Sequence, residues 1–206
     1  MKYKILDLFS GAGGFSKGFD MIDEFETVLA TDFNQPALET FQSNFPDALT
    51  ICGDITDKKI KNEILEKSRE LSVNMIIGGP PCQGFSNKGK KLGLGDPRNF
   101  LFLEYLDIVK HLNPEIFIIE NVKAMMTASD GYFMNEIKKK ISELGYFLDY
   151  GVLTASDFGV PQKRERTIII ASRRRKYYLP KKGSGPVVTV RDAIFDLAYL
   201  NSGEGE

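Results

Sequence analysis

Residues 3–20 read YKILDLFSGAGGFSKGFD, a short apolar run that leads into a turn with glycine at positions 11, 13 and 14. The run 3–8 has the length and composition of a β-strand, and the pattern at 15–22 is helical. Glycine lets the backbone turn sharply between the two and lets a ligand approach closely. A strand, a glycine turn and a helix in this order predict the first unit of an α/β fold.

The same alternation continues along the chain. Strands are expected at residues 3–8, 26–30, 49–52, 74–78, 116–120, 147–154 and 167–171, and helices at 15–22, 36–44, 58–71, 100–112, 132–144 and 189–197. This order indicates a Rossmann-like α/β fold with a mostly parallel sheet of about seven strands. The last two strands are joined by residues 155–166, too few for a parallel crossover, so this pair should be antiparallel.

Composition narrows the class of protein. The 206 residues suggest one domain, and the longest apolar runs are about eight residues, far below the roughly 20 that cross a bilayer. The N-terminus has no small-residue cleavage site, so we expect a cytoplasmic protein. The two cysteines form no disulfide framework or zinc cluster, and no metal is expected. We expect Cys52 to be buried and inert in its strand and His111 to be a solvated helix residue.

Charge is distributed unevenly, although the net charge is only −1. Nine basic residues lie between positions 160 and 182 against the single acid Glu165: Lys163, Arg164, Arg166, Arg173, Arg174, Arg175, Lys176, Lys181 and Lys182. A second cluster contains Lys88, Lys90 and Lys91, and residues 181–186 have the composition of a linker. Local clusters of this kind are typical of phosphate binding, and a solvated charged edge is the alternative interpretation.

Acids at strand ends accompany the glycine turn. The second strand is followed by Asp32 and Phe33, and the third by Asp54. Ligands of open α/β sheets bind at the carboxyl ends of the strands, where an acid can hold a ribose diol and an aromatic ring can stack on adenine. The glycine spacing does not fit GxGxxG, which argues against a nicotinamide cofactor. Together these features favour another adenosine-bearing cofactor over a tight turn with two capping acids.

A cysteine follows the fourth strand in the segment GGPPCQGFS, residues 78–86. Two glycines and two prolines place Cys82 on a stiff turn at the same edge of the sheet as the glycine turn. Its thiolate would be a nucleophile, and an inert buried cysteine is the alternative. A redox role is disfavoured because no resolving cysteine is evident.

Two further elements belong to this edge. Glu120 follows four apolar residues, so partial desolvation suits it to act as a general acid; a capping acid is the alternative. Arg164 and Arg166 alternate before the last strand, which predicts that both side chains lie on one face and recognise a base or a phosphate. The glycine-rich basic segment 87–98 could close on a phosphate backbone, or it is a plain flexible loop.

These motifs give the sequence a specific resemblance. From about Tyr3 to Leu197 the chain resembles the bacterial cytosine carbon-5 DNA methyltransferases, the modification methylases. DLFSGAGGFSKGF is similar to the cofactor turn of that family, PPCQGFS to its nucleophile segment, ENV to its acid segment and QKRER to its arginine segment. Each occurs once and in the order of the family.

The resemblance implies the methyltransferase version of the Rossmann-like fold and S-adenosylmethionine as cofactor, with S-adenosylhomocysteine as product. The residues that it implies for cofactor binding are Phe9, Gly11, Ala12, Gly13, Gly14, Asp32, Phe33, Asp54, Ile55, Pro80 and Leu101. Asp32 would hold the ribose and Phe33 the adenine face. Asp54 and Ile55 would contact the adenine edge.

The resemblance also implies a mechanism on a cytosine turned out of double-stranded DNA. Cys82 would attack ring carbon 6, and Glu120 would protonate or hydrogen-bond ring nitrogen 3. Arg166 would bind the ring carbonyl oxygen, with Arg164 in support. Residues implied in DNA binding are Ser86, Lys88, Lys90, Lys91 and Arg98. Such an enzyme would serve a bacterial restriction-modification system.

One departure from the family concerns domain organisation. Its members usually continue into a variable target-recognition domain and return with a last segment that completes the cofactor pocket, and neither is visible here. Residues 1–206 are therefore interpreted as an incomplete catalytic domain. A missing C-terminal part, a partner chain or a truncated gene product would each explain this. Two alternatives remain: a tRNA cytosine-5 methyltransferase of the same fold, and a non-catalytic fragment that binds cofactor or nucleic acid with a partner chain.

Overall fold

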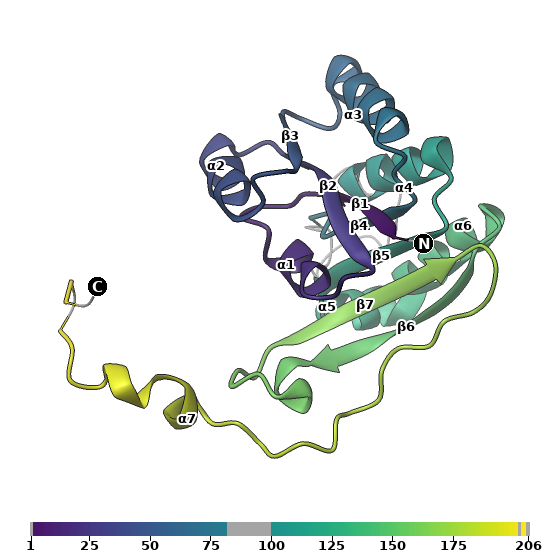
Figure 1. The fold of residues 1–206 in the computed structure, drawn as a ribbon. Helices are drawn as coiled ribbons and strands as arrows, with labels where there is room; N and C mark the ends of the chain where they lie inside the picture. The colour runs from purple at the N-terminus through teal and green to yellow at the C-terminus, as the bar shows by residue number, and fades with distance from the viewer. Residues whose placement is uncertain (1, 82–99, 202, 205–206) are drawn as a thin grey trace.

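The computed structural model describes residues 2–81, 100–201 and 203–204. Seven strands form one sheet in the order β3-β2-β1-β4-β5-β7-β6 (Figure 1). Their bounds are β1 Tyr3–Leu8, β2 Phe25–Asp32, β3 Leu49–Cys52, β4 Met75–Gly78, β5 Ile116–Val122, β6 Phe147–Thr154 and β7 Glu165–Ser172. The first five are mutually parallel, and β7 runs antiparallel to both β5 and β6. The predicted fold class, with its antiparallel last pair, is confirmed.

The helices also follow the sequence pattern closely. They are α1 Gly14–Asp20, α2 Gln35–Asn44, α3 Lys58–Glu70, α4 Phe100–Leu112, α5 Ala124–Thr127, α6 Tyr132–Glu143 and α7 Val190–Ile194, with 3-10 turns at Ala128–Gly131, Ala155–Phe158 and Phe195–Leu197. Asn34 caps α2 by accepting the N–H of Ala37, and proline follows early in the first turn. The predicted helix at 189–197 is divided between α7 and a 3-10 turn.

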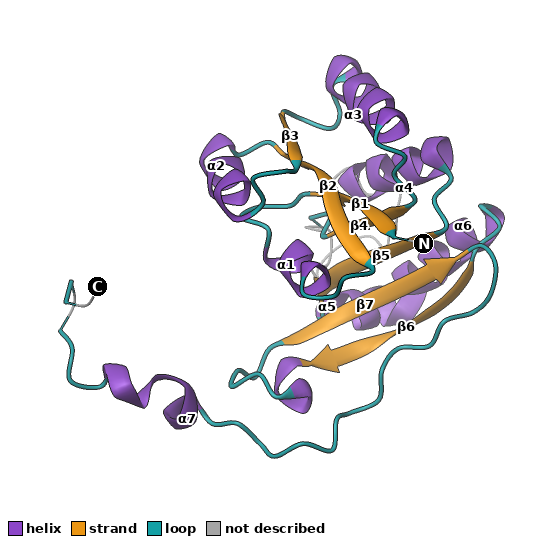
Figure 2. Cartoon of the chain, in the orientation of Figure 1, coloured by secondary structure: helices purple, strands orange, loops and turns teal. Residues whose placement is uncertain are grey.

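Helices cover both faces of the sheet (Figure 2). The larger core cluster contains alternate strand residues with α3, α4 and α6, and the smaller one lies on the α1 side. In β5, Phe117 faces the larger cluster and contacts Tyr105 of α4, while Ile116 and Ile118 face the smaller one. This alternation is the period of two that a strand covered on both faces requires.

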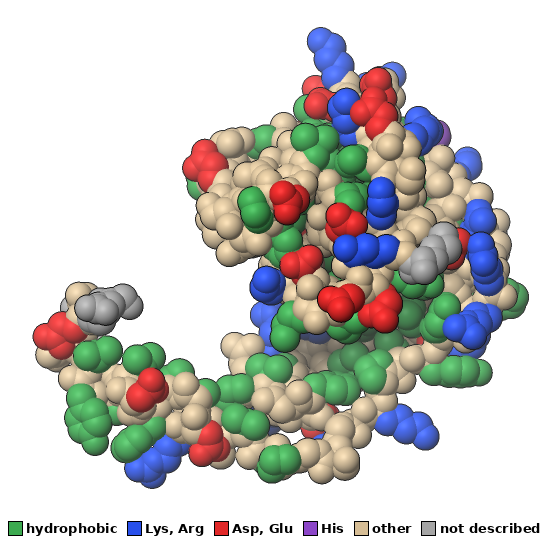
Figure 3. Space-filling view, viewed as in Figure 1, with side chains coloured by type: hydrophobic (Ala, Val, Ile, Leu, Met, Phe, Trp, Pro, Cys, Tyr) green, Lys and Arg blue, Asp and Glu red, His purple; other side chains and the backbone are tan. Residues whose placement is uncertain are grey.

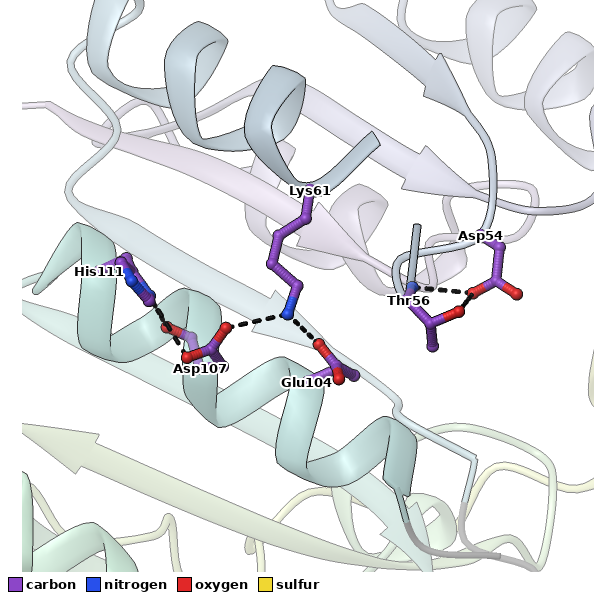
Figure 4. A network of polar contacts seen from close by, with 6 residues as sticks. All are labelled: Asp54, Thr56, Lys61, Glu104, Asp107 and His111. Atoms are coloured by element: carbon purple, nitrogen blue, oxygen red, sulfur yellow. Dashed lines mark hydrogen bonds and ion pairs between the residues drawn. The ribbon is translucent and has the colours of Figure 1, made fainter. Parts of the chain in front are cut away.

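Helices α3 and α4 are joined by a polar contact beside the sheet (Figure 4). Lys61 of α3 pairs with Glu104 and, at 2.9 Å, with Asp107 of α4. One turn further on, the Nδ1 of His111 lies 2.8 Å from the carbonyl oxygen of Asp107, and the side chain is exposed. His111 is thus a solvated helix residue, as predicted.

The strand order places a topological switch at β1. The chain proceeds from β1 to β2 and β3 on one side, and then returns to β4 and β5 on the other. Ligand crevices form outside the carboxyl ends of strands at such a switch. The turns after β1, β2, β3, β4 and β5 therefore meet at one edge, which we call the carboxyl edge.

The segment after β7 returns along β6 and then leaves the body of the molecule. The Leu179 N–H donates to the Asp149 carboxylate at 2.9 Å, and the Gly183 N–H donates to the Asp157 carbonyl oxygen at 2.9 Å. Residues 187–201, which we call the arm, extend beyond the body (Figures 1 and 3). Large apolar side chains of the arm are exposed, Tyr199 to 82%.

The run of basic residues does not form one cluster. Because β7 is antiparallel, Arg164 and Arg166 lie at the carboxyl edge, whereas residues 173–176 lie at the opposite edge. There the Arg173 N–H donates to the Glu115 carbonyl oxygen at 3.1 Å, and the Arg174 guanidinium pairs with the Glu115 carboxylate at 2.9 Å. The sequence run therefore joins two separate surfaces.

The expectation that Cys52 is buried is wrong. Cys52 is exposed and is the last residue of β3. Strand β3 is at the edge of the sheet and has a neighbour on one side only, so its end remains open to solvent.

Within the described part of the chain, no helix has the length and apolar character needed to span a bilayer.

Candidate functional site

The glycine turn after β1 has a backbone that few sequences can adopt. Phe9, Gly11 and Gly13 have φ angles of 61°, 52° and 90°. A Cβ on Gly13 would also lie 2.5 Å from the Phe45 ring, so this position requires glycine. Phe9 holds a left-handed conformation that is costly for a side chain of this size, and such strain is typical of functional turns.

Asp32 links the end of β2 to this turn. One carboxylate oxygen accepts the Gly11 N–H at 2.9 Å and the other accepts the Asn34 N–H at 2.9 Å. Asp32 therefore organises the glycine turn. The neighbouring Phe33 is 76% exposed and presents its ring at the carboxyl edge. The Asp54 carboxylate is held by Thr56, whose backbone N–H and hydroxyl both donate to it (Figure 4).

A cavity of about 320 Å³ lies among the ends of β1, β2, β3 and β4. Its lining residues are Phe9, Thr31, Asp32, Phe33, Gly53, Asp54, Ile55, Pro81, Phe100 and Leu101. Six of them are predicted cofactor residues. The volume is at the lower end of small-molecule sites, and mostly apolar walls with a few polar groups are typical of such sites. Apolar walls with two carboxylates fit an adenosine group.

A second cavity of about 480 Å³ lies on the α1 side of the carboxyl edge. It is lined by Asp7, Phe9, Gly14, Phe15, Gly79, Glu120 and Arg164. Phe9 lines both cavities. The two cavities are therefore neighbours on either side of Phe9, and the candidate catalytic acid lines the second.

Glu120 is held by the two predicted arginines. Its Oε1 lies 2.9 Å from Arg166 Nε and 3.4 Å from Arg164 Nη2, and the side chain is 27% exposed. The shared partner confirms that the two arginines lie on one face of the chain before and within β7. Gly79 leaves room beside this carboxylate, since a Cβ there would lie 3.3 Å from Oε2. The partial desolvation predicted for Glu120 is confirmed, and it is accompanied by positive charge.

Two buried polar residues at the carboxyl edge are not predicted as site residues by the sequence patterns. Asn121 is 6% exposed, and its side-chain amide donates to the Pro80 carbonyl oxygen at 2.8 Å. Asp7 is 1% exposed and accepts the Ser16 hydroxyl at 2.6 Å. Burial raises the pKa of Asp7 to about 7. A polar residue at the end of an apolar strand is the sequence signal that could have identified both.

The remaining predicted residues lie as follows. Gly11 contacts Asp32, Ala12 is exposed and accepts the Asn44 side-chain amide through its carbonyl, and Gly14 lines the second cavity. Pro80 is buried, and its neighbour Pro81 lines the first cavity. Cys82, Ser86, Lys88, Lys90, Lys91 and Arg98 lie outside the described residues. Among the described residues no group of three His, Cys, Asp or Glu is arranged to hold a metal ion.

The sheet order and the antiparallel β7 define the Rossmann-like fold of S-adenosylmethionine-dependent methyltransferases. The chain aligns with a solved structure described as a DNA modification methyltransferase encoded within a prophage (E. coli), with a TM-score of 0.76 and 30% identity over 94% of this chain and 55% of that one. The model of the C-5 cytosine-specific DNA methylases matches residues 3–197, and the chain belongs to this family.

Curated relatives agree with this assignment. The type II methyltransferase M1.HphI of Haemophilus parahaemolyticus is 39% identical over 99% of this chain and 55% of its own length. The type II methyltransferase M.AquIA of Picosynechococcus sp. is 41% identical over 90% of this chain and 79% of its own length. The chain thus spans about half the length of the first relative and more of the second.

Proposed function

We propose that this chain is the catalytic part of a DNA cytosine-5 methyltransferase of the restriction-modification type, which acts in the cytoplasm on double-stranded DNA. The observation that carries the proposal is the placement of Glu120. Its carboxylate is held by Arg164 and Arg166 in a cavity that shares the lining residue Phe9 with the adenosine-sized cavity. A methyl donor and an acceptor base could therefore meet at this point.

The first cavity is proposed to hold the adenosine end of S-adenosylmethionine, and the bound cofactor would supply an electrophilic methyl group. Asp32 and Asp54 would accept hydrogen bonds from the ribose hydroxyls and the adenine edge, and Phe33 would stack on the ring. Ile55 and Leu101 would close the apolar walls and exclude water. The methionine end would extend past Phe9 towards Gly14.

The second cavity is proposed to receive the target cytosine. Leaving the duplex costs the base a few kcal/mol. Glu120 would protonate or hydrogen-bond ring nitrogen 3, and Arg166, oriented by Glu120, would donate to the ring carbonyl oxygen. Both contacts would stabilise negative charge that develops in the ring during attack, in a site partly shielded from water.

Cys82 follows the described Pro80 by two residues and is proposed as the nucleophile. Its thiolate would form a bond to ring carbon 6, which makes carbon 5 nucleophilic enough to take the methyl group. Loss of the carbon-5 proton and departure of the thiolate would restore the aromatic ring. The Asn121 amide, which holds the Pro80 carbonyl, would fix the start of the nucleophile turn.

An open depression of about 510 Å³ lies beside the second cavity and supports DNA as the substrate. Its lining includes the cations Lys123, Lys163, Arg164 and Arg166 and one acid, Glu165, which pairs with Lys123; Arg164 also lines the second cavity. Cations at the entrance of the base cavity would neutralise phosphates next to the extruded nucleotide. Recognition of the DNA sequence is proposed to come from a further region or a second chain, since the exposed apolar arm offers a contact surface.

The test is covalent trapping on a duplex that carries 5-fluorocytosine, because fluorine at carbon 5 prevents the proton loss that releases the enzyme. We expect Cys82→Ser to abolish both methyl transfer and the trapped complex while cofactor affinity is retained. Cys52→Ser is the matched control, since Cys52 is exposed and outside both cavities. Substantial methyl transfer by Cys82→Ser would contradict the proposed nucleophile. Methylation of tRNA in place of duplex DNA would contradict the proposed substrate.

A further inference from the structure

A partly buried ion-pair cluster joins α3 to α4 and has no part in the proposed mechanism. The Lys61 ammonium of α3 pairs with the Glu104 carboxylate and, at 2.9 Å, with the Asp107 carboxylate of α4 (Figure 4). The side chain of Lys61 is 19% exposed, that of Glu104 26% and that of Asp107 39%. Charges with this much shielding from water attract each other more strongly than charges on an open surface, so the cluster is a firmer link than an exposed ion pair.

The cluster lies about one helical turn from the adenosine-sized cavity. Residues 53–55, which lead into α3, line this cavity together with Phe100 and Leu101 in the first turn of α4. Lys61 is the fourth residue of α3, and Glu104 is the fifth residue of α4. At a rise of about 1.5 Å per residue, each lies roughly 5–6 Å along its helix from the first residue. The ion pairs therefore join the two helices close to the residues that line the cavity.

One face of α4 carries both the cluster and part of the cavity lining. Phe100, Glu104 and Asp107 have the spacing i, i+4, i+7, which places them in one stripe along the helix. The other side of α4 packs in the larger core cluster through Phe102, Tyr105, Leu106, Ile108 and Val109. A rotation or shift of α4 that separated Glu104 from Lys61 would therefore also move the Phe100 ring at the cavity.

The charge balance of the cluster depends on Lys61. Glu104 and Asp107 are three residues apart on one helix face, a spacing at which like charges repel. Burial lowers the pKa of Lys61, but its hydrogen bonds to the two acids outweigh this effect and the pKa is raised, so the ammonium is charged at neutral pH. Without it, two partly buried carboxylates would face α3 with no compensating charge, which favours a wider separation of the two helices.

We propose that Lys61 is a positioning residue for the cofactor: by holding Glu104 and Asp107 it fixes α4 against α3 and thereby sets the width of the adenosine-sized cavity. Lys61 is not among the described residues that line this cavity, so it would act through Phe100 and Leu101. The inference rests on the proposed cofactor site and names a residue outside that site on which cofactor affinity depends.

The first experiment tests the position of α4 without any ligand. The sequence contains no tryptophan, so Phe100→Trp places a single tryptophan beside the cavity, and its fluorescence emission measures the exposure of that position. In this background Lys61→Met removes the ammonium, Lys61→Arg retains the charge, and Lys67→Met is the matched control. Lys67 is also in α3, but its ion pair with Glu70 at 2.8 Å stays within that helix. We expect a red shift of the emission for Lys61→Met alone.

The second experiment is isothermal titration calorimetry of the 206-residue chain without the tryptophan reporter. The probes are S-adenosylhomocysteine and 5′-methylthioadenosine, which lacks the amino-acid end. We expect Lys61→Met to bind both probes about five- to tenfold more weakly, and Lys61→Arg and Lys67→Met to bind them within about twofold of wild type. A loss of affinity confined to S-adenosylhomocysteine would overturn the inference, because the amino-acid end lies outside the adenosine-sized cavity.

The outcomes separate the inference from the proposed function. Either an unchanged emission or an unchanged affinity in folded Lys61→Met would overturn the inference and leave the proposed function intact, even if the variant unfolds at lower denaturant. If Lys61→Met does not fold, Glu104→Gln takes its place, since it removes one of the two ion pairs, and a smaller change in the same direction is expected. Wild type that binds neither probe would overturn the proposed function, and the tryptophan emission would still decide whether Lys61 positions α4.

Discussion

Asn121 connects the end of β5 to Pro80, and its replacement should separate the positioning of the proposed nucleophile from cofactor binding. Its side-chain amide N–H donates to the Pro80 carbonyl oxygen at 2.8 Å, and its side-chain oxygen Oδ1 accepts the Val122 N–H at 2.9 Å. Asn121→Ala removes both contacts and leaves Glu120 in place. The two residues are distant in sequence, so this contact is a direct restraint between β5 and Pro80, which precedes the proposed nucleophile Cys82 by two residues.

The expected loss of stability depends on the polar groups that Asn121→Ala leaves without a hydrogen-bond partner. The buried Pro80 carbonyl would lose its donor, which costs about 1–3 kcal/mol of the free energy of unfolding. The Val122 N–H adds little, because this residue is 43% exposed and water can replace the partner. If the restraint is needed when the thiolate attacks, the same energy enters the activation barrier. The rate constant of methyl transfer would then fall by roughly 5- to 150-fold.

The assay compares Asn121→Ala with Tyr146→Phe. The Tyr146 hydroxyl donates to the Pro114 carbonyl at 2.8 Å, so its removal also orphans a buried proline carbonyl, but next to the start of β5 at the opposite edge. We expect similar losses of stability in chemical denaturation, and a lower kcat with unchanged cofactor affinity for Asn121→Ala alone. The alkylation rate of Cys82 in a Cys52→Ser background measures the reactivity of this thiol in the absence of DNA. A kcat and an alkylation rate within twofold of wild type would refute the positioning role.

Two further predictions concern the arginine pair and the glycine turn. Arg166→Lys removes the planar Nε contact at 2.9 Å to Glu120 and should lower kcat more than Arg164→Lys does. The reason is that Arg164 lies 3.4 Å from Glu120 and its side chain is 51% exposed. Equal effects of the two substitutions in single-turnover assays would argue against this order. Gly13→Ala places a Cβ 2.5 Å from the Phe45 ring at a φ of 90° and should destabilise the fold by at least about 2 kcal/mol. In the control Gly18→Ala, the added Cβ meets open space in α1, so this variant should be neutral or more stable by about 0.5–1 kcal/mol. Thermal denaturation measures both changes.

The sequence was sufficient for the architecture because periodicity and turn residues report local structure. Strands β1, β3 and β6 and helix α4 begin and end where the pattern predicts. Cys52 could not be placed in this way, because its exposure depends on the position of β3 at the edge of the sheet. The link from Asn121 to Pro80 is equally non-local, and it joins residues 41 positions apart.

The positions of the basic residues also could not be predicted from local sequence patterns. They follow from the topology of the sheet. In a parallel strand, the residues that follow the strand reach the carboxyl edge, as Asp32 and Glu120 near the ends of β2 and β5 do. Strand β7 is inserted antiparallel between β5 and β6, so the residues at its beginning reach that edge. Arg164 and Arg166 can therefore contact Glu120, although one precedes its strand and the other is near its start. The antiparallel strand thus supplies cations to an edge at which the parallel strands present acids.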